Sequence, residues 1–281
     1  MAFKCRTFLS RPEWKSVPFL HVQKTTEDQL MDVLLHIPGL LESTMAANQQ
    51  TQDKGMLLET ICCQQFQLDH WRNDWTKLNL NSAISIPISH GSHSLSPFLA
   101  SYLSSGIRTN TTQQAIELIC YHSAMFLLGQ LKRLLEGHGP KQDIITSIAY
   151  HEAVNSSEVL PNAANPLLLP DRTKMPWQHG LEGLRILAGF CGGSSSNAGL
   201  YLAFAPIGIL YCFSEYLGIQ QMVISMISGE DWAEDAEQEM GPYRLFSLDA
   251  LPSEQGNVAE IDSSFDRSSV AQRLFINNSW P

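Results

Sequence analysis

Hydrophobic residues recur at helical spacing along most of the chain. Between residues 56 and 80, apolar side chains lie three, four or seven positions apart, which is the spacing of one helix face. These positions are Leu57, Ile61, Leu68, Trp71, Trp75 and Leu78. Similar patterns predict helices from 111 to 136, from 141 to 154, from 177 to 190, and in two pieces from 198 to 227. Because strong strand-like alternation is absent, the pattern predicts an all-α fold.

Capping residues and helix breakers set the expected boundaries. Thr26 with Gln29, and Thr111 with Gln114, have the spacing of a capping box, in which two side chains satisfy the first backbone N–H groups of a helix. The pair Pro38–Gly39 is predicted to end the first of these helices. Residues 81–105 and 155–176 are predicted to be long loops because they are rich in residues that break regular structure. We therefore expect one helical domain over residues 1–230, and an acidic, polar, partly loose segment over 231–281.

The charge of the chain narrows the range of partners. There are 28 acidic and 18 basic side chains, a formal net charge of −10, so the surface repels phosphate and direct nucleic-acid binding is disfavoured. The longest apolar stretch, 198–217, is broken by Pro206 and Glu215, which predicts buried helices and no membrane span. The scattered cysteines are typical of a reducing compartment, so we expect a cytoplasmic protein, or a nuclear one if it regulates transcription.

Four segments, taken in order, match a known pattern. They are Pro12 to Trp14, the helix with Trp71 and Trp75, Tyr121 to Leu128, and Trp177 to Leu187. Together they span roughly residues 8 to 227, and they resemble the fungal-specific transcription factor domain, the regulatory half of zinc-cluster transcription factors. The resemblance implies a helical fold with a central cavity that senses metabolites or binds partners, and it supplies no catalytic residues.

The family's DNA-reading half needs six closely spaced cysteines that bind zinc. The six cysteines here are Cys5, Cys62, Cys63, Cys120, Cys191 and Cys212, and no two of them form a CxxC pair. We therefore expect no zinc-cluster domain, no structural zinc and no direct contact with DNA. His90 and His93 lie three residues apart in a Ser-rich stretch, but two histidines without a third ligand are a weak metal signal, so no metal site is predicted.

Polar side chains within apolar helices are the candidate site. We predict that the catalytic residues are His179, His122, Glu182 and Arg185, and that the substrate-binding residues are Trp71, Trp75, Tyr121 and Trp177. His179, Glu182 and Arg185 follow one another at one-turn spacing, so they share a helix face. The alternatives are an ordinary ion pair on a helix surface, a core histidine at 122, and tryptophans that only pack the core.

Two functions from different classes fit these observations. The first is a cofactor-independent cyclase or isomerase of the pericyclase type, which would bind a small apolar substrate in fungal secondary metabolism. Shape and one or two hydrogen bonds suffice for such reactions, and no cofactor signature is found in the sequence. The second is a non-DNA-binding regulatory module that senses a metabolite or pairs with a full-length regulator. The resemblance to a regulatory domain without its DNA-reading half favours the enzyme slightly, because a cavity could still be useful when DNA is not bound. A homodimer is left open.

Overall fold

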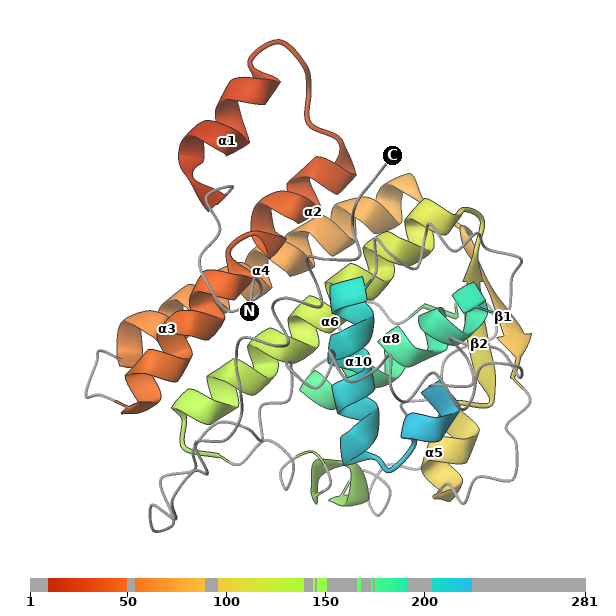
Figure 1. Ribbon diagram of the computed structural model, residues 1–281. Helices are drawn as coiled ribbons and strands as arrows, with labels where there is room; N and C mark the ends of the chain where they lie inside the picture. The colour runs from red at the N-terminus through yellow and green to blue at the C-terminus, as the bar shows by residue number, and fades with distance from the viewer. Residues whose placement is uncertain are drawn as a thin grey trace, which may run out of the picture. The chain divides into compact units, whose positions relative to one another are not determined.

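The computed structural model describes residues 10–49, 54–88, 96–138, 144, 146–150, 166–167, 173, 175–191 and 204–223. All of them belong to one compact unit, Met1–Ala250. This part is mostly helical and has one small two-stranded sheet, which confirms the predicted all-α class (Figure 1). No helix in it is both long enough and apolar enough to cross a membrane. The predicted acidic segment 231–281, and His90 and His93, lie outside the described residues.

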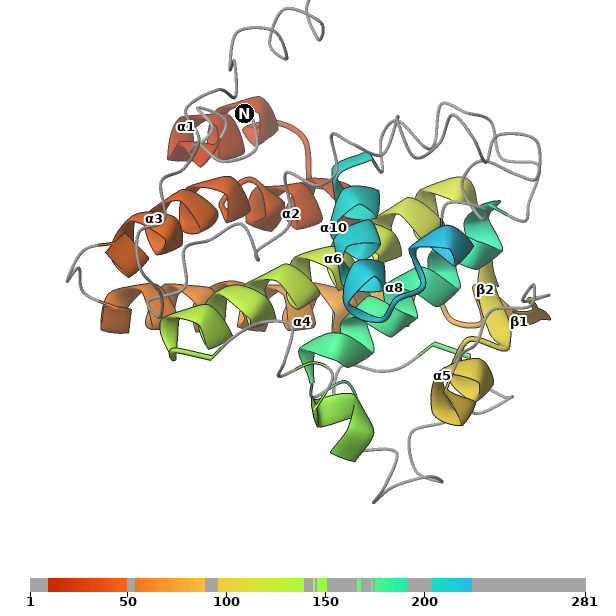
Figure 2. The same ribbon diagram turned by 60° about the horizontal axis from the view of Figure 1, so that its bottom comes forward.

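The first described elements are short helices, of which the last two pack against a long helix. They are α1 (Pro12–Ser16), the 3-10 helix η3 (Val17–Phe19), α2 (Thr26–Leu34) and α3 (Ile37–Gln49). Helices α2 and α3 lie side by side with α4 (Lys54–Leu78), as the two views in Figures 1 and 2 show. On α4 the predicted stripe is buried at Ile61, Leu68, Trp71 and Trp75, whereas Leu78, at the end of the helix, is exposed.

Two predicted boundaries in this region are wrong by small shifts. The capping box forms one residue earlier than expected: Thr25 Oγ1 accepts from the Asp28 backbone N–H at 3.1 Å, and Asp28 Oδ2 accepts from the Thr25 N–H at 2.9 Å. The pair Pro38–Gly39 does not end a helix. Helix α2 ends at Leu34, and Pro38 lies in the first turn of α3, where a proline needs no N–H partner.

The predicted loop at 81–105 contains regular structure. Strand β1 (Ala83–Pro87) pairs antiparallel with β2 (Ser105–Thr109), from the Ala83–Thr109 pair to the Pro87–Ser105 pair. The segment that connects the two strands contains helix α5 (Pro97–Tyr102), whose N-terminus is capped by Ser96 Oγ. The prediction of an unbroken loop is therefore corrected. Strands of five residues are too short for their alternation to exceed the background of the sequence.

Helix α6 (Thr112–Leu135) is the centre of the unit. Its predicted capping box at Thr111 and Gln114 is confirmed, with both reciprocal hydrogen bonds present. After the C-cap Glu136 comes Gly137, whose φ of +83° is a left-handed conformation that glycine adopts without strain. The His138 N–H then returns to the Arg133 carbonyl at 3.0 Å, a Schellman ending. Nearly all of α6 is buried, because α2, α3, α4, α8 and α10 all pack against it.

Residues 144 and 146–150 are helical, within the helix predicted from 141 to 154. The helices after them are α8 (Pro176–Cys191), as predicted, and α10 (Phe204–Tyr216). Every residue of α8 from Trp177 to Phe190 is buried, because α6, α10 and β2 pack around it. The closest approach is at Gly189, where an added Cβ would lie 2.0 Å from the Ile107 carbonyl oxygen of β2. The division predicted between 198 and 227 falls at Gly218, where φ is +68°, and Pro206 lies inside the first turn of α10.

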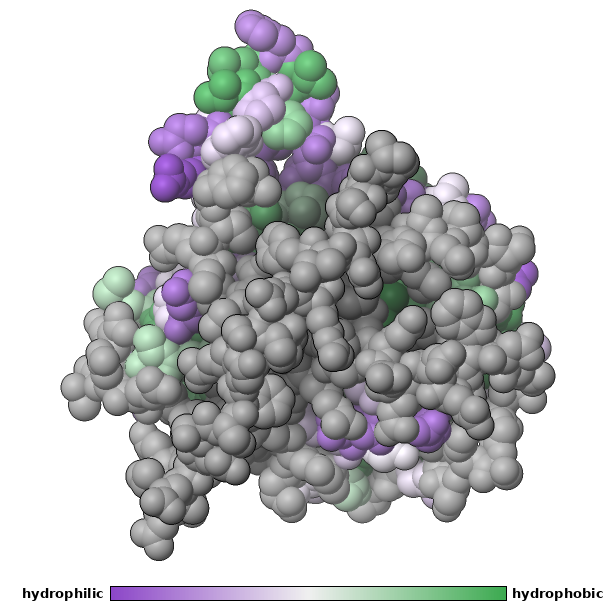
Figure 3. Space-filling view, in the orientation of Figure 1, coloured by the Kyte–Doolittle hydropathy of each residue, from purple (hydrophilic) through white to green (hydrophobic). Residues whose placement is uncertain are grey.

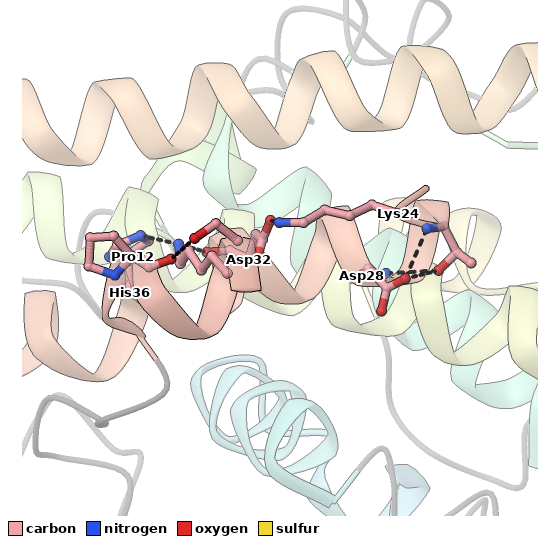
Figure 4. A network of polar contacts seen from close by, with 8 residues as sticks. Pro12, Lys24, Asp28, Asp32 and His36 are labelled. Carbon is pink, nitrogen blue, oxygen red and sulfur yellow. Dashed lines mark hydrogen bonds and ion pairs between the residues drawn. The ribbon is translucent and has the colours of Figure 1, made fainter. Parts of the chain in front are cut away.

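The N-terminal segment is held by charges and exposes apolar side chains. Lys15 and Lys24 both bind Asp32 of α2, through its backbone carbonyl and its carboxylate respectively, and Lys15 also contacts His36. Figure 4 shows Lys24, Asp32 and His36 along this side of α2. Helix α1 buries none of its residues, and Trp14 is 52% exposed. Figure 3 accordingly shows apolar and polar residues intermixed on the surface of this segment.

Candidate functional site

Three helices bring most of the predicted site residues together. Helix α4 supplies Trp71 and Trp75, and α6 supplies Tyr121 and His122. Helix α8 supplies Trp177, His179, Glu182 and Arg185. All of these side chains are buried. A helix buried on every face is normally apolar, so polar groups on α8 are expected to have partners or a function. We call Arg72, Tyr121, His122, His179, Glu182 and Arg185 the buried polar cluster.

Glu182 and Arg185 form an ion pair inside the protein. Arg185 Nη1 lies 2.8 Å from Glu182 Oε2, and neither side chain has any exposed surface. The alternative of an ordinary ion pair on a helix surface is therefore wrong. The guanidinium also donates to the Ser105 carbonyl at 3.0 Å, to Ser105 Oγ at 3.2 Å and to the Pro166 carbonyl at 3.3 Å. These bonds use most of the donors of Arg185, and the two to Ser105 connect α8 with β2, which favours a structural role for this residue.

His122 and His179 face each other through the same kind of nitrogen. Their Nδ1 atoms are 3.3 Å apart, and their ring centroids are 5.4 Å apart. Burial holds the pKa of His122 well below its usual range, and the nearby His179 lowers it further. Burial, with the charge of Arg72, lowers the pKa of His179 to about 3. Both imidazoles are therefore neutral near pH 7, so one Nδ1 donates and the other accepts.

The second ring nitrogen of His122, Nε2, does not take part in the contact between the two histidines. Nε2 is fully buried, and no hydrogen-bond partner lies near it among the described residues. A buried polar atom without a partner costs about 1–3 kcal/mol. Such an atom is the kind of group that a bound molecule can satisfy.

Aromatic rings surround the histidines. Tyr121 meets His122 and His179 edge-on, at centroid distances of 4.9 and 5.7 Å, and its other neighbour Trp71 lies at 5.7 Å. Trp71 also contacts Trp75 at 6.5 Å. Three of the four predicted substrate-binding residues are thus contiguous with the histidine pair. The fourth, Trp177, belongs to a separate aromatic group, where it packs edge-on against Phe98 at 5.9 Å.

The polar ends of the aromatic side chains are already bound. Trp71 Nε1 donates to the Thr26 carbonyl and Trp75 Nε1 to Glu117 Oε2, both at 2.7 Å. The Tyr121 hydroxyl donates to Asp69 Oδ1 at 3.0 Å. Burial raises the pKa of both Tyr121 and Asp69. These rings can therefore offer shape and faces to a ligand, and Tyr121 stays a protonated phenol near pH 7.

The sequence analysis missed Arg72. This side chain has no exposed surface, although it stands in the polar run that follows Trp71. The helical spacing does indicate that Arg72 is buried, because Arg72 is four residues after Leu68 and three before Trp75 and so shares their face of α4. Its guanidinium lies 4.9 Å from the ring of Trp75, and Nη1 binds Thr76 Oγ1.

The site offers hydrogen-bonding groups more than metal ligands. Among the residues that the structure describes, no three His, Cys, Asp or Glu side chains are grouped so that they could hold a metal ion. Searches against family models, curated proteins and solved structures find no match to this chain. The resemblance to the fungal transcription factor domain therefore stays a prediction, and the function must be argued from the cluster itself.

Proposed function

We propose that the chain binds a small apolar metabolite beside the His122–His179 pair and catalyses its cyclisation or isomerisation without a cofactor. The observation that carries this proposal is the buried, unpartnered Nε2 of His122, next to the rings of Tyr121 and Trp71. Small-molecule sites combine apolar walls with a few polar atoms in this way.

The chemistry assigned to the histidines follows from their low pKa. A neutral imidazole can donate one hydrogen bond to a carbonyl oxygen and thereby stabilise the negative charge that builds up there as the substrate rearranges. A cyclisation or isomerisation moves bonds within one molecule, so it needs no external oxidant, reductant or transferred group. The aromatic side chains would select the reactive conformer of the substrate.

The test is incubation of the full chain with polyene and terpenoid intermediates, followed by chromatography and mass spectrometry for products of unchanged mass. The variants His122→Ala and His179→Ala should each lower turnover by about tenfold or more, which is the usual effect of removing one hydrogen bond to developing charge. His70→Ala is the matched control, because this histidine is also helical but its side chain is 72% exposed. Circular dichroism of each variant checks the fold.

Three outcomes separate the alternatives. Full activity in both variants would place the site elsewhere. Unfolding of both would identify them as core histidines. Ligand binding that depends on His122 but produces no product would favour the alternative function, a regulatory module that senses a metabolite and does not bind DNA.

A further inference from the structure

Arg72 places a positive charge inside the protein. Its side chain is fully buried, and a guanidinium keeps its proton under all ordinary conditions. Removing such a charge from water costs several kcal/mol unless an opposite charge and hydrogen bonds compensate for it. Among the described residues, no carboxylate forms an ion pair with Arg72. The compensation present is the ring of Trp75, at 4.9 Å, and one hydrogen bond to Thr76.

The carboxylates of this region are bound to other groups. Glu182, whose negative charge reaches Arg72, is paired with Arg185 at 2.8 Å. Asp69 accepts from Tyr121, and Glu117 accepts from the indole N–H of Trp75. The two buried arginines, 72 and 185, therefore share Glu182 as their buried counter-charge. Asp69 and Glu117 keep their negative charge because their hydrogen-bond donors are neutral, but among the described residues neither forms an ion pair with Arg72.

The unused donors of Arg72 lie on one edge of the guanidinium. Nε and Nη2 are buried and have no hydrogen-bond partner among the described residues, whereas Nη1 is held by Thr76. Nε and Nη2 form the fork that binds the two oxygens of a carboxylate side by side. Arg185 gives an internal comparison, because it uses the same edge to bind the two oxygens of Ser105.

We propose that Arg72 binds an anionic oxygen group of the ligand, a carboxylate or an acidic enol, so that the ligand is a small apolar acid. This inference rests on the small-molecule site proposed above and assigns the chemical class of its ligand. The acid would give Nε and Nη2 of Arg72 a direct anionic partner, and its apolar body would lie against the neighbouring aromatic rings. Arg72 also lowers the pKa of both histidines by its charge, which places it within electrostatic reach of the pair.

Two probes with the same apolar tail test the proposal: octanoate, an acid, and octanol, its neutral counterpart. Quenching of tryptophan fluorescence reports binding, because Trp75 stacks on Arg72. The full chain should bind octanoate at least about tenfold more tightly than octanol, as expected for a charge-assisted bidentate contact. In Arg72→Met this preference should disappear while octanol binding is unchanged. Arg72→Lys should keep part of it, because lysine retains the charge but not the fork.

The folding of the variant is informative too. Methionine is apolar and nearly as long as arginine, so Arg72→Met should fold and should be at least as stable as the wild type without ligand. Octanoate should raise the melting temperature of the wild type and leave that of Arg72→Met unchanged. Loss of folding in Arg72→Met would overturn the proposal, because the cation would then be part of the core.

The remaining outcomes are also decisive. Equal binding of both probes, no binding of either, or a preference for octanoate that survives in Arg72→Met would each overturn the proposal. Failure of the proposed catalysis looks different: the octanoate preference would depend on Arg72, but no candidate substrate would be converted. Conversely, turnover that depends on His122 without an acid preference would remove the role of Arg72 alone.

Discussion

Replacing Gly189 by alanine tests the packing that positions the site. An added Cβ would lie 2.0 Å from the Ile107 carbonyl oxygen and 2.9 Å from the Arg108 nitrogen. Close carbon–oxygen contacts are normally about 3.3 Å or longer, so α8 and β2 would have to separate by roughly 1.3 Å. Both clashing atoms are backbone, so no flexible side chain can move aside. Ile107 is also fully buried.

Two effects of opposite sign compete in this variant. Alanine is favoured over glycine inside a helix by about 1 kcal/mol, which would stabilise the variant. Overpacking of a well-packed core typically costs about 1–3 kcal/mol, and a backbone clash of this depth belongs at the upper end. We therefore expect a net loss of about 2 kcal/mol, equivalent to a fall in melting temperature of roughly 4–8 °C for a domain of this size.

Urea denaturation followed by circular dichroism gives the free energy of unfolding, and a thermal melt gives the second measure. Gly137→Ala is the control, because its Cβ would meet nothing within 4 Å and its cost is limited to about 1–2 kcal/mol for the left-handed backbone. A higher melting temperature for Gly189→Ala would refute the reasoning, since helix preference would then outweigh the contact with β2. An unchanged fold with weaker octanoate binding would instead mean that α8 shifts as a unit.

Two further predictions concern the buried charges. Below pH 6.5 the free energy of unfolding should fall by up to about 1.4 kcal/mol per pH unit for each of His122 and His179, because the pKa of each is depressed only in the folded state. Above that pH the stabilisation is complete. In a pH series of urea melts, the double variant His122→Asn/His179→Asn should therefore show a shallower dependence of the unfolding free energy on pH. A slope equal to that of the wild type would contradict this. Arg185→Met should cost about 3–5 kcal/mol, because it removes the positive charge that is paired with the buried Glu182 carboxylate. Arg185→Met combined with Glu182→Leu should recover much of that loss in the same assay. Equal stability of the single variant and the wild type would show that the ion pair is dispensable.

The predictions that succeeded depend on local chemistry. The capping box at Thr111 and Gln114 and the helix end at Gly137 involve residues within a few positions of each other, so the sequence contains the whole interaction. At the N-terminus the same logic chose Thr26, although Thr25 with Asp28 makes the bonds. Neighbouring hydroxyl residues compete for one cap, and composition alone does not decide between them.

The features that were missed depend on contacts between distant segments. The β1–β2 pair joins residues from the Ala83–Thr109 pair to the Pro87–Ser105 pair that are distant in the sequence, and each strand alone is too short to be recognised. Arg72 was not among the predicted site residues, because an arginine is rarely buried; the helix that carries it, α4, packs against α6 in the fold. The pairing of His122 with His179 likewise required the α6–α8 contact, although each histidine was predicted separately.

The hydrogen bond between the two histidine rings has a consequence for specificity. If His122 donates through Nδ1, its Nε2 is an acceptor, and if His179 donates, the Nε2 of His122 carries the proton. A ligand carbonyl would select the second arrangement and a ligand hydroxyl the first, with no change in net charge. In the proposed site, the pair could therefore accommodate a ketone and the corresponding alcohol at the same position. Discrimination between these two oxidation states of a ligand would have to come from other groups in the site that can only donate, or only accept, a hydrogen bond.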